Sequence, residues 1–226
     1  MIIAIDGPAG SGKSSTARAV AEALGYLYID TGAMYRAVAL AFLLADAPFT
    51  DEAAARLLPD LEVAFWPQAE APPRIALNGE DVSEAIRTEA VGDGASRVSA
   101  LRAVREKMVA LQRRLATQHP DGVVLDGRDI GTVVFPDAPV KIFLTATDTV
   151  RAQRRCEELR QRGVVAALDD VLADLRERDH RDRTRATSPL RQADDAVVVD
   201  TSHQPLAYQV SRVLDIVREH ASPGAV

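Results

Sequence analysis

A glycine-rich stretch near the start of the chain has the spacing of a phosphate-binding loop. Residues 7–14 are Gly-Pro-Ala-Gly-Ser-Gly-Lys-Ser, which fits the pattern G-x-x-x-x-G-K-[ST]. Glycines let the backbone bend around an anion, so that successive N–H groups and the start of the next helix face nucleotide phosphates. In this pattern Lys13 meets the β- and γ-phosphates and Ser14 holds Mg²⁺. The alternative is a glycine turn that only packs tightly, but such a turn has no use for lysine and serine at these positions.

The elements on either side of this stretch fit the same interpretation. The apolar run from Ile2 to Ile5 predicts a strand buried on both faces of a parallel sheet. Residues Lys13 to Leu24 predict a helix, which Gly25 ends. We therefore expect ATP to be bound by the whole stretch and by the serine that follows it, namely Gly7, Pro8, Ala9, Gly10, Ser11, Gly12, Lys13, Ser14 and Ser15.

A second group of charged residues follows another apolar run. Residues Val123 to Leu125 predict a strand, and Asp126, Arg128 and Asp129 come directly after it. Because ligands gather at the carboxyl ends of parallel strands, we expect these residues to lie over the phosphate-binding loop. Asp126 is placed like the acidic residue that binds Mg²⁺ or its water shell. A simple ion-paired turn is the alternative.

Another predicted strand, Tyr26 to Ile29, ends at Asp30 and Thr31, and a helix is expected from Ala33 to Leu44. Arg36 lies about one turn into that helix and could reach an anion at the same sheet edge. Taken alone, Arg36 is better explained as an ordinary solvated helix arginine.

The alternation of strands and helices predicts the fold class. Two further apolar runs, Val140 to Leu144 and Ala196 to Val199, bring the number of strands to five. Five strands alternating with helices predict an α/β fold with a doubly wound parallel sheet.

The sequence pattern between Leu61 and Ser99 differs from the alternating strands and helices of the rest of the chain. Short apolar runs, a proline-rich break after Trp66 and an Asn78-Gly79 turn predict a β-hairpin, followed by a helical piece around Ser83 to Ala90. The segment is either ordinary decoration of the core or a moving substrate flap.

Two arginine-rich helices are expected near the C-terminus. They cover Asp148 to Gly163 and a stretch from Asp169 onward, and the break at Gly163 is of the kind that lets a lid close. Arg178, Asp182 and Arg185 are spaced to share one helical face. That face is a solvated salt-bridged surface, a nucleic-acid patch or an anion clamp.

Composition narrows the class of protein. The 226 residues allow one α/β core with a small insert, and the net charge of −6 argues against a protein that coats nucleic acid. Cys156 is the only cysteine, so the chain can form no internal disulfide. Neither a membrane-spanning run nor a signal peptide is found, so we expect a cytoplasmic protein. Residues 221–226 are expected to fray.

Taken together, these residues resemble the bacterial cytidylate kinases, a family of nucleoside monophosphate kinases. The resemblance covers nearly the whole chain and rests on residues 5–14, on Asp30-Thr31-Gly32-Ala33-Met34-Tyr35-Arg36, on 126–136, which begins Asp-Gly-Arg-Asp, and on Arg176-Glu177-Arg178-Asp179. It implies a P-loop kinase that passes the γ-phosphoryl group of ATP to CMP or dCMP with the help of Mg²⁺, in pyrimidine metabolism. It also implies a core of residues 1–60 and 100–226, a monophosphate-binding insert at 61–99 and a lid at about 151–168.

The resemblance also implies roles for individual residues. Family positions matching Thr31, Arg105 and Asp129 read the cytosine, and those matching Arg36, Arg128 and Arg185 hold the acceptor phosphate. Positions matching Ser96, Arg178 and Asp182 touch the sugar, and Arg154 and Arg155 match arginines of the lid. The catalytic set is then Lys13, Arg128, Arg154, Arg155 and Asp126, with Mg²⁺ on Ser14 and, through water, on Asp126. We expect the enzyme to be a monomer with no nucleic-acid or membrane partner.

The charged residues of the predicted site also suit the chemical demands of phosphoryl transfer. A phosphate acceptor is already anionic at neutral pH, so the reaction needs positive charge and positioning rather than a nucleophile and base. Asp129 can accept a hydrogen bond from the amine of cytosine, whereas uracil presents a carbonyl there. The alternatives are a P-loop kinase for adenylate, uridylate or a non-nucleotide alcohol, a regulatory NTPase, and a nucleic-acid-binding module. The pattern Asn/Thr-Lys-x-Asp, which reads guanine in regulatory switches, is missing from the sequence.

Overall fold

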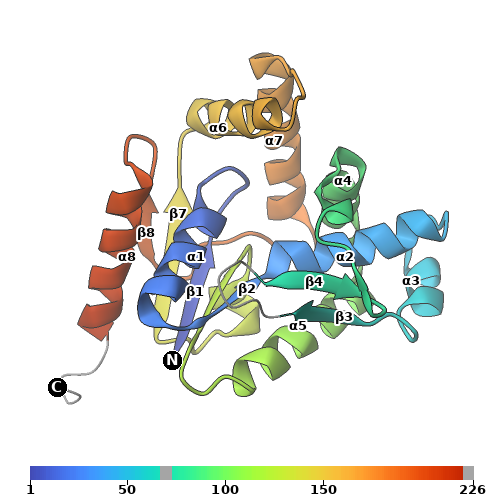
Figure 1. Cartoon of the computed structure of the whole chain (residues 1–226), viewed down its shortest axis with the longest axis horizontal. Helices are drawn as coiled ribbons and strands as arrows, with labels where there is room; N and C mark the ends of the chain where they lie inside the picture. The colour runs from blue at the N-terminus through green and yellow to red at the C-terminus, as the bar shows by residue number, and fades with distance from the viewer. Residues whose placement is uncertain (67–72, 221–226) are drawn as a thin grey trace. The chain divides into compact units, whose positions relative to one another are not determined.

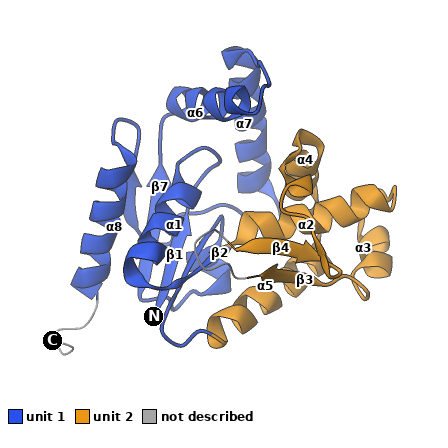
Figure 2. Ribbon diagram, in the orientation of Figure 1, with its two compact units in different colours: residues 1–29, 119–226 blue, residues 30–118 orange. Residues whose placement is uncertain are grey.

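The computed structural model describes residues 1–66 and 73–220 (Figure 1). The proline-rich break after Trp66 and the predicted fraying of residues 221–226 lie outside the described residues. The chain divides into two compact units, residues 1–29 with 119–226, and residues 30–118, coloured separately in Figure 2. None of the described helices is long and apolar enough to cross a membrane.

A five-stranded sheet forms the centre of the first unit. Its strands are β1 (Ile2–Asp6), β2 (Leu27–Asp30), β6 (Val123–Gly127), β7 (Val140–Thr145) and β8 (Val197–Asp200). They lie in the order β2-β6-β1-β7-β8, and β1 pairs in parallel with both β6 and β7. The chain leaves β1 toward β2 on one side of the sheet and leaves the neighbouring β7 toward β8 on the other side. The carboxyl ends of β1 and β7 therefore flank the topological switch point, where such sheets bind ligands.

Helices of the first unit cover this sheet and extend beyond its carboxyl edge. They are α1 (Lys13–Leu24), α6 (Asp148–Gln161), α7 (Leu168–Thr184), α8 (Leu206–His220) and the π-helical turn η2 (Ile130–Val134). Contacts join α1 to α8 and both helices to the sheet, while α6 packs against α7 (Figure 1). The break between α6 and α7 includes Gly163, whose φ of 78° is readily adopted only by glycine.

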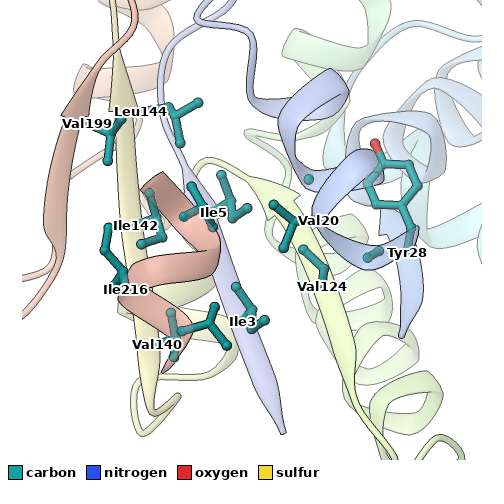
Figure 3. Close-up of a cluster of buried hydrophobic side chains, with 14 residues drawn as sticks. Ile3, Ile5, Val20, Tyr28, Val124, Val140, Ile142, Leu144, Val199 and Ile216 are labelled. Atoms are coloured by element: carbon teal, nitrogen blue, oxygen red, sulfur yellow. The ribbon is translucent and has the colours of Figure 1, made fainter. Parts of the chain in front are cut away.

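Apolar side chains from strands and helices form the core of this unit. Ile3 and Ile5 of β1 and Ile142 of β7 pack with Val20 of α1 and Ile216 of α8 (Figure 3). All five side chains are at most 1% exposed. Burial of each contributes roughly 1.5–3 kcal/mol. This packing holds the strand ends in place and therefore fixes the residues that follow them.

The second unit combines a small sheet with helices. Its elements are α2 (Thr31–Leu44), α3 (Asp51–Leu57), β3 (Val63–Trp66), β4 (Arg74–Leu77), β5 (Glu80–Asp81), the 3₁₀ turn η1 (Ala85–Arg87), α4 (Glu89–Val98) and α5 (Arg102–Thr117). Strands β3, β4 and β5 form an antiparallel sheet. The turn between β4 and β5 is Asn78-Gly79, with φ angles of 50° and 82°, so the predicted hairpin turn is confirmed.

The fold class is confirmed, two local predictions are wrong and one helix is missed. The helical piece expected at Ser83 to Ala90 is a 3₁₀ turn, and the longer helix α4 begins only at Glu89, where Thr88 accepts a hydrogen bond from the N–H of Val91. Helix α3 is not predicted, because seven residues give too short a periodic pattern. Arg185 lies one residue beyond α7, with a ψ of 139°, and so does not share its helical face.

Residues 61–99 do not form a compact unit alone, since they group with α2, α3 and α5 in residues 30–118. The boundaries of the core, insert and lid stay predictions.

Candidate active site

The glycine-rich loop joins β1 to α1 in the first unit, and its backbone could not carry larger residues. A Cβ atom on Gly7 would lie 2.1 Å from the carbonyl oxygen of Leu144, closer than atoms can approach. Gly10 and Gly12 have positive φ angles of 73° and 87°. The loop therefore has the glycine-dependent path that a phosphate cradle requires. We call residues 7–14 the cradle.

Lys13 of the cradle begins α1 and is buried. Its side chain donates a hydrogen bond of 3.1 Å to the carbonyl of Pro8. Burial, together with the positive charge of Arg128, lowers the pKa of Lys13 from 10.5 to about 7. An anion in the cradle would stabilise the charged ammonium, so these two buried cations form a site suited to polyanions.

Asp126 lies at the end of β6, next to the start of α1. The hydroxyl of Ser14 donates to one carboxylate oxygen at 2.6 Å, and the hydroxyl of Tyr28 donates to the other at 3.0 Å. Strand pairing sets this position, because Asp126 is in register with Ile5, two residues before the cradle. The predicted pair of Ser14 and Asp126 therefore lies together.

These two oxygen-bearing residues fit a magnesium ion. Mg²⁺ prefers oxygen ligands and usually takes only one or two from the protein, with phosphates and waters completing the octahedron. A hydroxyl and a carboxylate beside a phosphate cradle are such a set. Among the residues that the structure describes, no three His, Cys, Asp or Glu side chains gather into a metal cluster of their own.

Arg128 follows β6 and pairs with helix α7. Its Nε donates to Oδ2 of Asp182 at 2.8 Å, and both side chains are largely buried. Burial alone would raise the pKa of Asp182, but Arg128 and Arg178 outweigh it and hold that pKa below its usual range. Arg128 and Asp182 therefore stay charged at neutral pH, with the guanidinium fixed by its carboxylate partner.

Asp129 lies one residue further on, at the start of η2. A carboxylate oxygen of Asp129 is 3.8 Å from a guanidinium nitrogen of Arg185, and each side chain is 6% exposed. The Nε of Arg185 donates to the carbonyl of Ser188 at 2.7 Å, which holds the arginine beyond the end of α7. The local structure thus brings the predicted residues Asp129 and Arg185 together.

A residue that the sequence reasoning missed supports Asp129. Asp6 ends β1 and accepts hydrogen bonds of 2.8 Å from the backbone N–H groups of Ile130 and Gly131. Burial raises the pKa of Asp6 from 3.8 to about 7, although these two hydrogen bonds act in the opposite direction. The available signal was an acidic residue at the end of a buried strand, the same signal that selected Asp126.

The two predicted lid arginines differ in their surroundings. Arg154 donates to the hydroxyl and the carbonyl of Thr201, at 3.0 and 2.6 Å. A Cβ atom on Gly12 would lie 3.6 Å from Arg154, so this arginine borders the cradle. Arg155 instead forms a 3.1 Å ion pair with Glu158 on the next turn of α6. The structure therefore brings Arg154, and not Arg155, to the cradle.

Four predicted substrate-binding residues belong to the second unit. Thr31 is the first residue of α2 and is buried; Arg36 lies further along α2 and pairs with no carboxylate among the described residues. Arg105 of α5 is 2% exposed, with its guanidinium 5.6 Å from the centre of the Tyr35 ring. The buried hydroxyl of Ser96 in α4 has no hydrogen-bond partner within the described chain. It is free to bond to a ligand.

A glycine-rich phosphate cradle at the switch point of a parallel sheet, with a buried lysine and a serine–aspartate pair, defines a P-loop nucleotide-binding protein. The family model described as Cytidylate kinase matches residues 3–219. The chain belongs to this family and is therefore a phosphotransferase of the nucleoside monophosphate kinase class.

Comparison with individual relatives supports the same family. The chain is 48% identical to a cytidylate kinase of Salinibacter ruber, over 99% of this chain and 100% of the relative. It is 47% identical to a cytidylate kinase of Geobacter sulfurreducens, over 100% of this chain and 97% of the relative. A solved structure of an uncharacterized protein from Eubacterium ventriosum has a TM-score of 0.52 at 13% identity and covers 97% of this chain and 98% of that one, a likeness of fold alone.

Proposed function

We propose that this enzyme transfers the γ-phosphoryl group of ATP directly to CMP or dCMP, giving CDP or dCDP and ADP. The relatives named as cytidylate kinases support the choice of substrate. The observation that carries the chemistry is the glycine-dependent cradle with its buried Lys13, beside the hydrogen-bonded pair of Ser14 and Asp126. Two polyanions that must meet in line need positive charge such as that of Lys13.

On the donor side, the proposed ligands of ATP are the backbone of the cradle and the side chain of Lys13. Ser14 and Asp126 would hold Mg²⁺, with Asp126 acting through water. When bound, the ion neutralises charge on the β- and γ-phosphates. The acceptor is already anionic, so no residue of the chain has to remove a proton from it.

On the acceptor side, we assign three tasks. Thr31, Arg105 and Asp129 would read the cytosine, Arg36, Arg128 and Arg185 would hold the phosphate, and Ser96, Arg178 and Asp182 would bind the sugar. Two of these assignments are supported because, within the described part of the chain, Arg36 pairs with no carboxylate and the Ser96 hydroxyl has no hydrogen-bond partner. Arginine suits the phosphate because its planar group binds two oxygens at once.

We also propose which segments of the chain move during the reaction and where in the cell the enzyme works. Residues 61–99 would be the monophosphate-binding insert and residues 151–168 the lid, with Arg154 and Arg155 neutralising charge as the lid closes. We propose that the enzyme works as a cytoplasmic monomer in pyrimidine metabolism, without nucleic-acid or membrane partners. The net charge of −6 supports the absence of a nucleic-acid partner.

A panel of acceptors in a coupled assay for ADP tests the proposed substrate. With ATP and Mg²⁺ fixed, kcat/KM is measured for CMP, dCMP, UMP, AMP, GMP and shikimate. We expect CMP and dCMP to give the highest values. A higher kcat/KM for AMP, GMP or shikimate than for CMP would overturn the substrate assignment.

A further inference from the structure

Arg151, in the first turn of α6, is the largest fully buried side chain of the described protein and belongs to none of the roles above. It is 2% exposed, although it carries a permanent charge. A charge is buried at this depth only when hydrogen bonds and opposite charges compensate for the lost water. The partners that compensate Arg151 indicate its task.

One arm of the guanidinium binds the cradle. The Nη1 of Arg151 donates to the carbonyl oxygen of Ala9 at 2.9 Å. The backbone of Arg151 also contacts the cradle directly, since a Cβ atom on Gly10 would lie 3.1 Å from its carbonyl oxygen. Two consecutive residues of the cradle are therefore held against the start of α6.

The other arm binds helix α7. The Nη2 of Arg151 lies 2.7 Å from Oδ2 of Asp179, which is itself 4% exposed, and 2.6 Å from Oδ1 of Asp148. The two carboxylates differ in what they connect. Asp148 belongs to α6 itself and is 44% exposed, whereas Asp179 lies on α7, 28 residues after Arg151. Asp148 also accepts a hydrogen bond of 3.1 Å from Arg176 of α7, but both of these side chains are exposed. The bond to Asp179 is the buried link between the cradle and α7.

The far end of this link reaches the proposed acceptor site. Asp179 and Asp182 are three residues apart on α7, so they lie on the same side of the helix. Asp182 holds Arg128 at 2.8 Å, and both are proposed to bind CMP. Buried bonds thus connect Ala9 to Arg151 and Arg151 to Asp179 on α7. The same turn of α7 carries Asp182, which in turn binds Arg128.

We propose that Arg151 is a positioning residue that couples the ATP site to the CMP site. Nucleotide phosphates that fix the cradle also fix Ala9, and through Arg151 they fix the turn of α7 that carries Asp182. Arginine is required because its planar group can serve two partners in fixed directions at once. The inference rests on the proposed CMP site on α7, and it assigns no contact between Arg151 and either substrate.

The coupling is measured as the ratio of CMP dissociation constants without and with saturating Mg²⁺–adenylyl imidodiphosphate, by calorimetry. In the unaltered enzyme we expect the ATP analogue to tighten CMP binding by about fivefold or more. Asp179→Asn should bring this ratio to within about twofold of unity. Asp148→Asn weakens a bond of similar length to the same nitrogen, together with the exposed pair between Asp148 and Arg176, but leaves the buried bond to Asp179 intact, so it should keep the original ratio.

A second variant covers the event that Asp179→Asn does not fold. Arg151→Lys keeps a positive charge beside Asp179, but its single ammonium cannot reproduce both arms of the arginine, and the ratio should again approach unity. An unchanged ratio in either variant, with a native circular dichroism spectrum, would overturn the coupling, as would a ratio of one in the unaltered enzyme. Failure of the unaltered enzyme to bind CMP at all would instead overturn the proposed function.

Discussion

Asp129 is the residue whose replacement tests base recognition most sharply. The substitution Asp129→Asn keeps the size and shape of the side chain, which is only 6% exposed and lies 3.8 Å from Arg185. Asparagine still has one oxygen that can accept a hydrogen bond from the cytosine amine, but the bond loses its charge. It also gains an amide N–H that can donate to the carbonyl of uracil.

The size of the effect follows from these changes. A hydrogen bond to a charged group contributes about 1.5–3 kcal/mol, against about 1 kcal/mol for a neutral one. CMP therefore loses up to about 2 kcal/mol of binding in the transition state, and UMP gains up to about 1 kcal/mol. Since 1.4 kcal/mol corresponds to a factor of ten, we expect the ratio of kcat/KM for CMP over UMP to fall by roughly tenfold to a hundredfold.

The assay measures kcat/KM for both nucleotides in the altered and unaltered enzymes at the same pH and Mg²⁺ concentration. Asp137→Asn is a matched control, because Asp137 is an exposed aspartate in the loop after η2 and should leave the ratio unchanged. A ratio within twofold of the original in folded Asp129→Asn would remove Asp129 from base reading.

Three further predictions concern the cradle and its support. Lys13→Ala should lower kcat by at least about a hundredfold with an unchanged circular dichroism spectrum, and an active variant would refute the cradle assignment. Ser14→Ala should raise the Mg²⁺ concentration for half-maximal activity by roughly tenfold without changing KM for CMP, as a magnesium titration would show; an unchanged requirement would exclude Ser14 as a ligand. The pKa of Asp6 is raised to about 7 in the folded state, so its stabilising contribution is present at low pH and is lost as the pH rises toward 7. Between pH 5 and 8, the free energy of unfolding measured in urea should therefore fall by about 3 kcal/mol more in the unaltered protein than in Asp6→Asn. An equal pH dependence of the unfolding free energy in the two proteins would contradict the burial argument.

The sequence predicts best what is determined locally. The cradle, the helix Lys13–Leu24 and the Asn78-Gly79 turn depend on glycine, lysine, serine and asparagine at fixed spacings, and the structure has them where they are predicted. Helix ends were less accurate, because capping decides them. Asp30 accepts a hydrogen bond from the N–H of Ala33, so α2 begins at Thr31 rather than at Ala33.

The site was less predictable where residues act through tertiary contacts. Arg151 is one of four arginines in α6, whose sequence resembles an exposed surface, and nothing in the spacing separates it from Arg155. Its burial depends on Ala9 and Asp179, which are distant in sequence. Asp6 acts through two backbone N–H groups, which no sequence pattern marks.

Direct transfer between the two nucleotides is the central claim, and following the phosphorus atoms tests it most directly. In ³¹P NMR of the enzyme with ATP, CMP and Mg²⁺, we predict that ADP and CDP appear in equal amounts and that no inorganic phosphate is released. When CMP is omitted, we predict that the ATP signals stay constant. Release of inorganic phosphate while CMP stays unchanged would contradict the account and identify the protein as a nucleotide hydrolase.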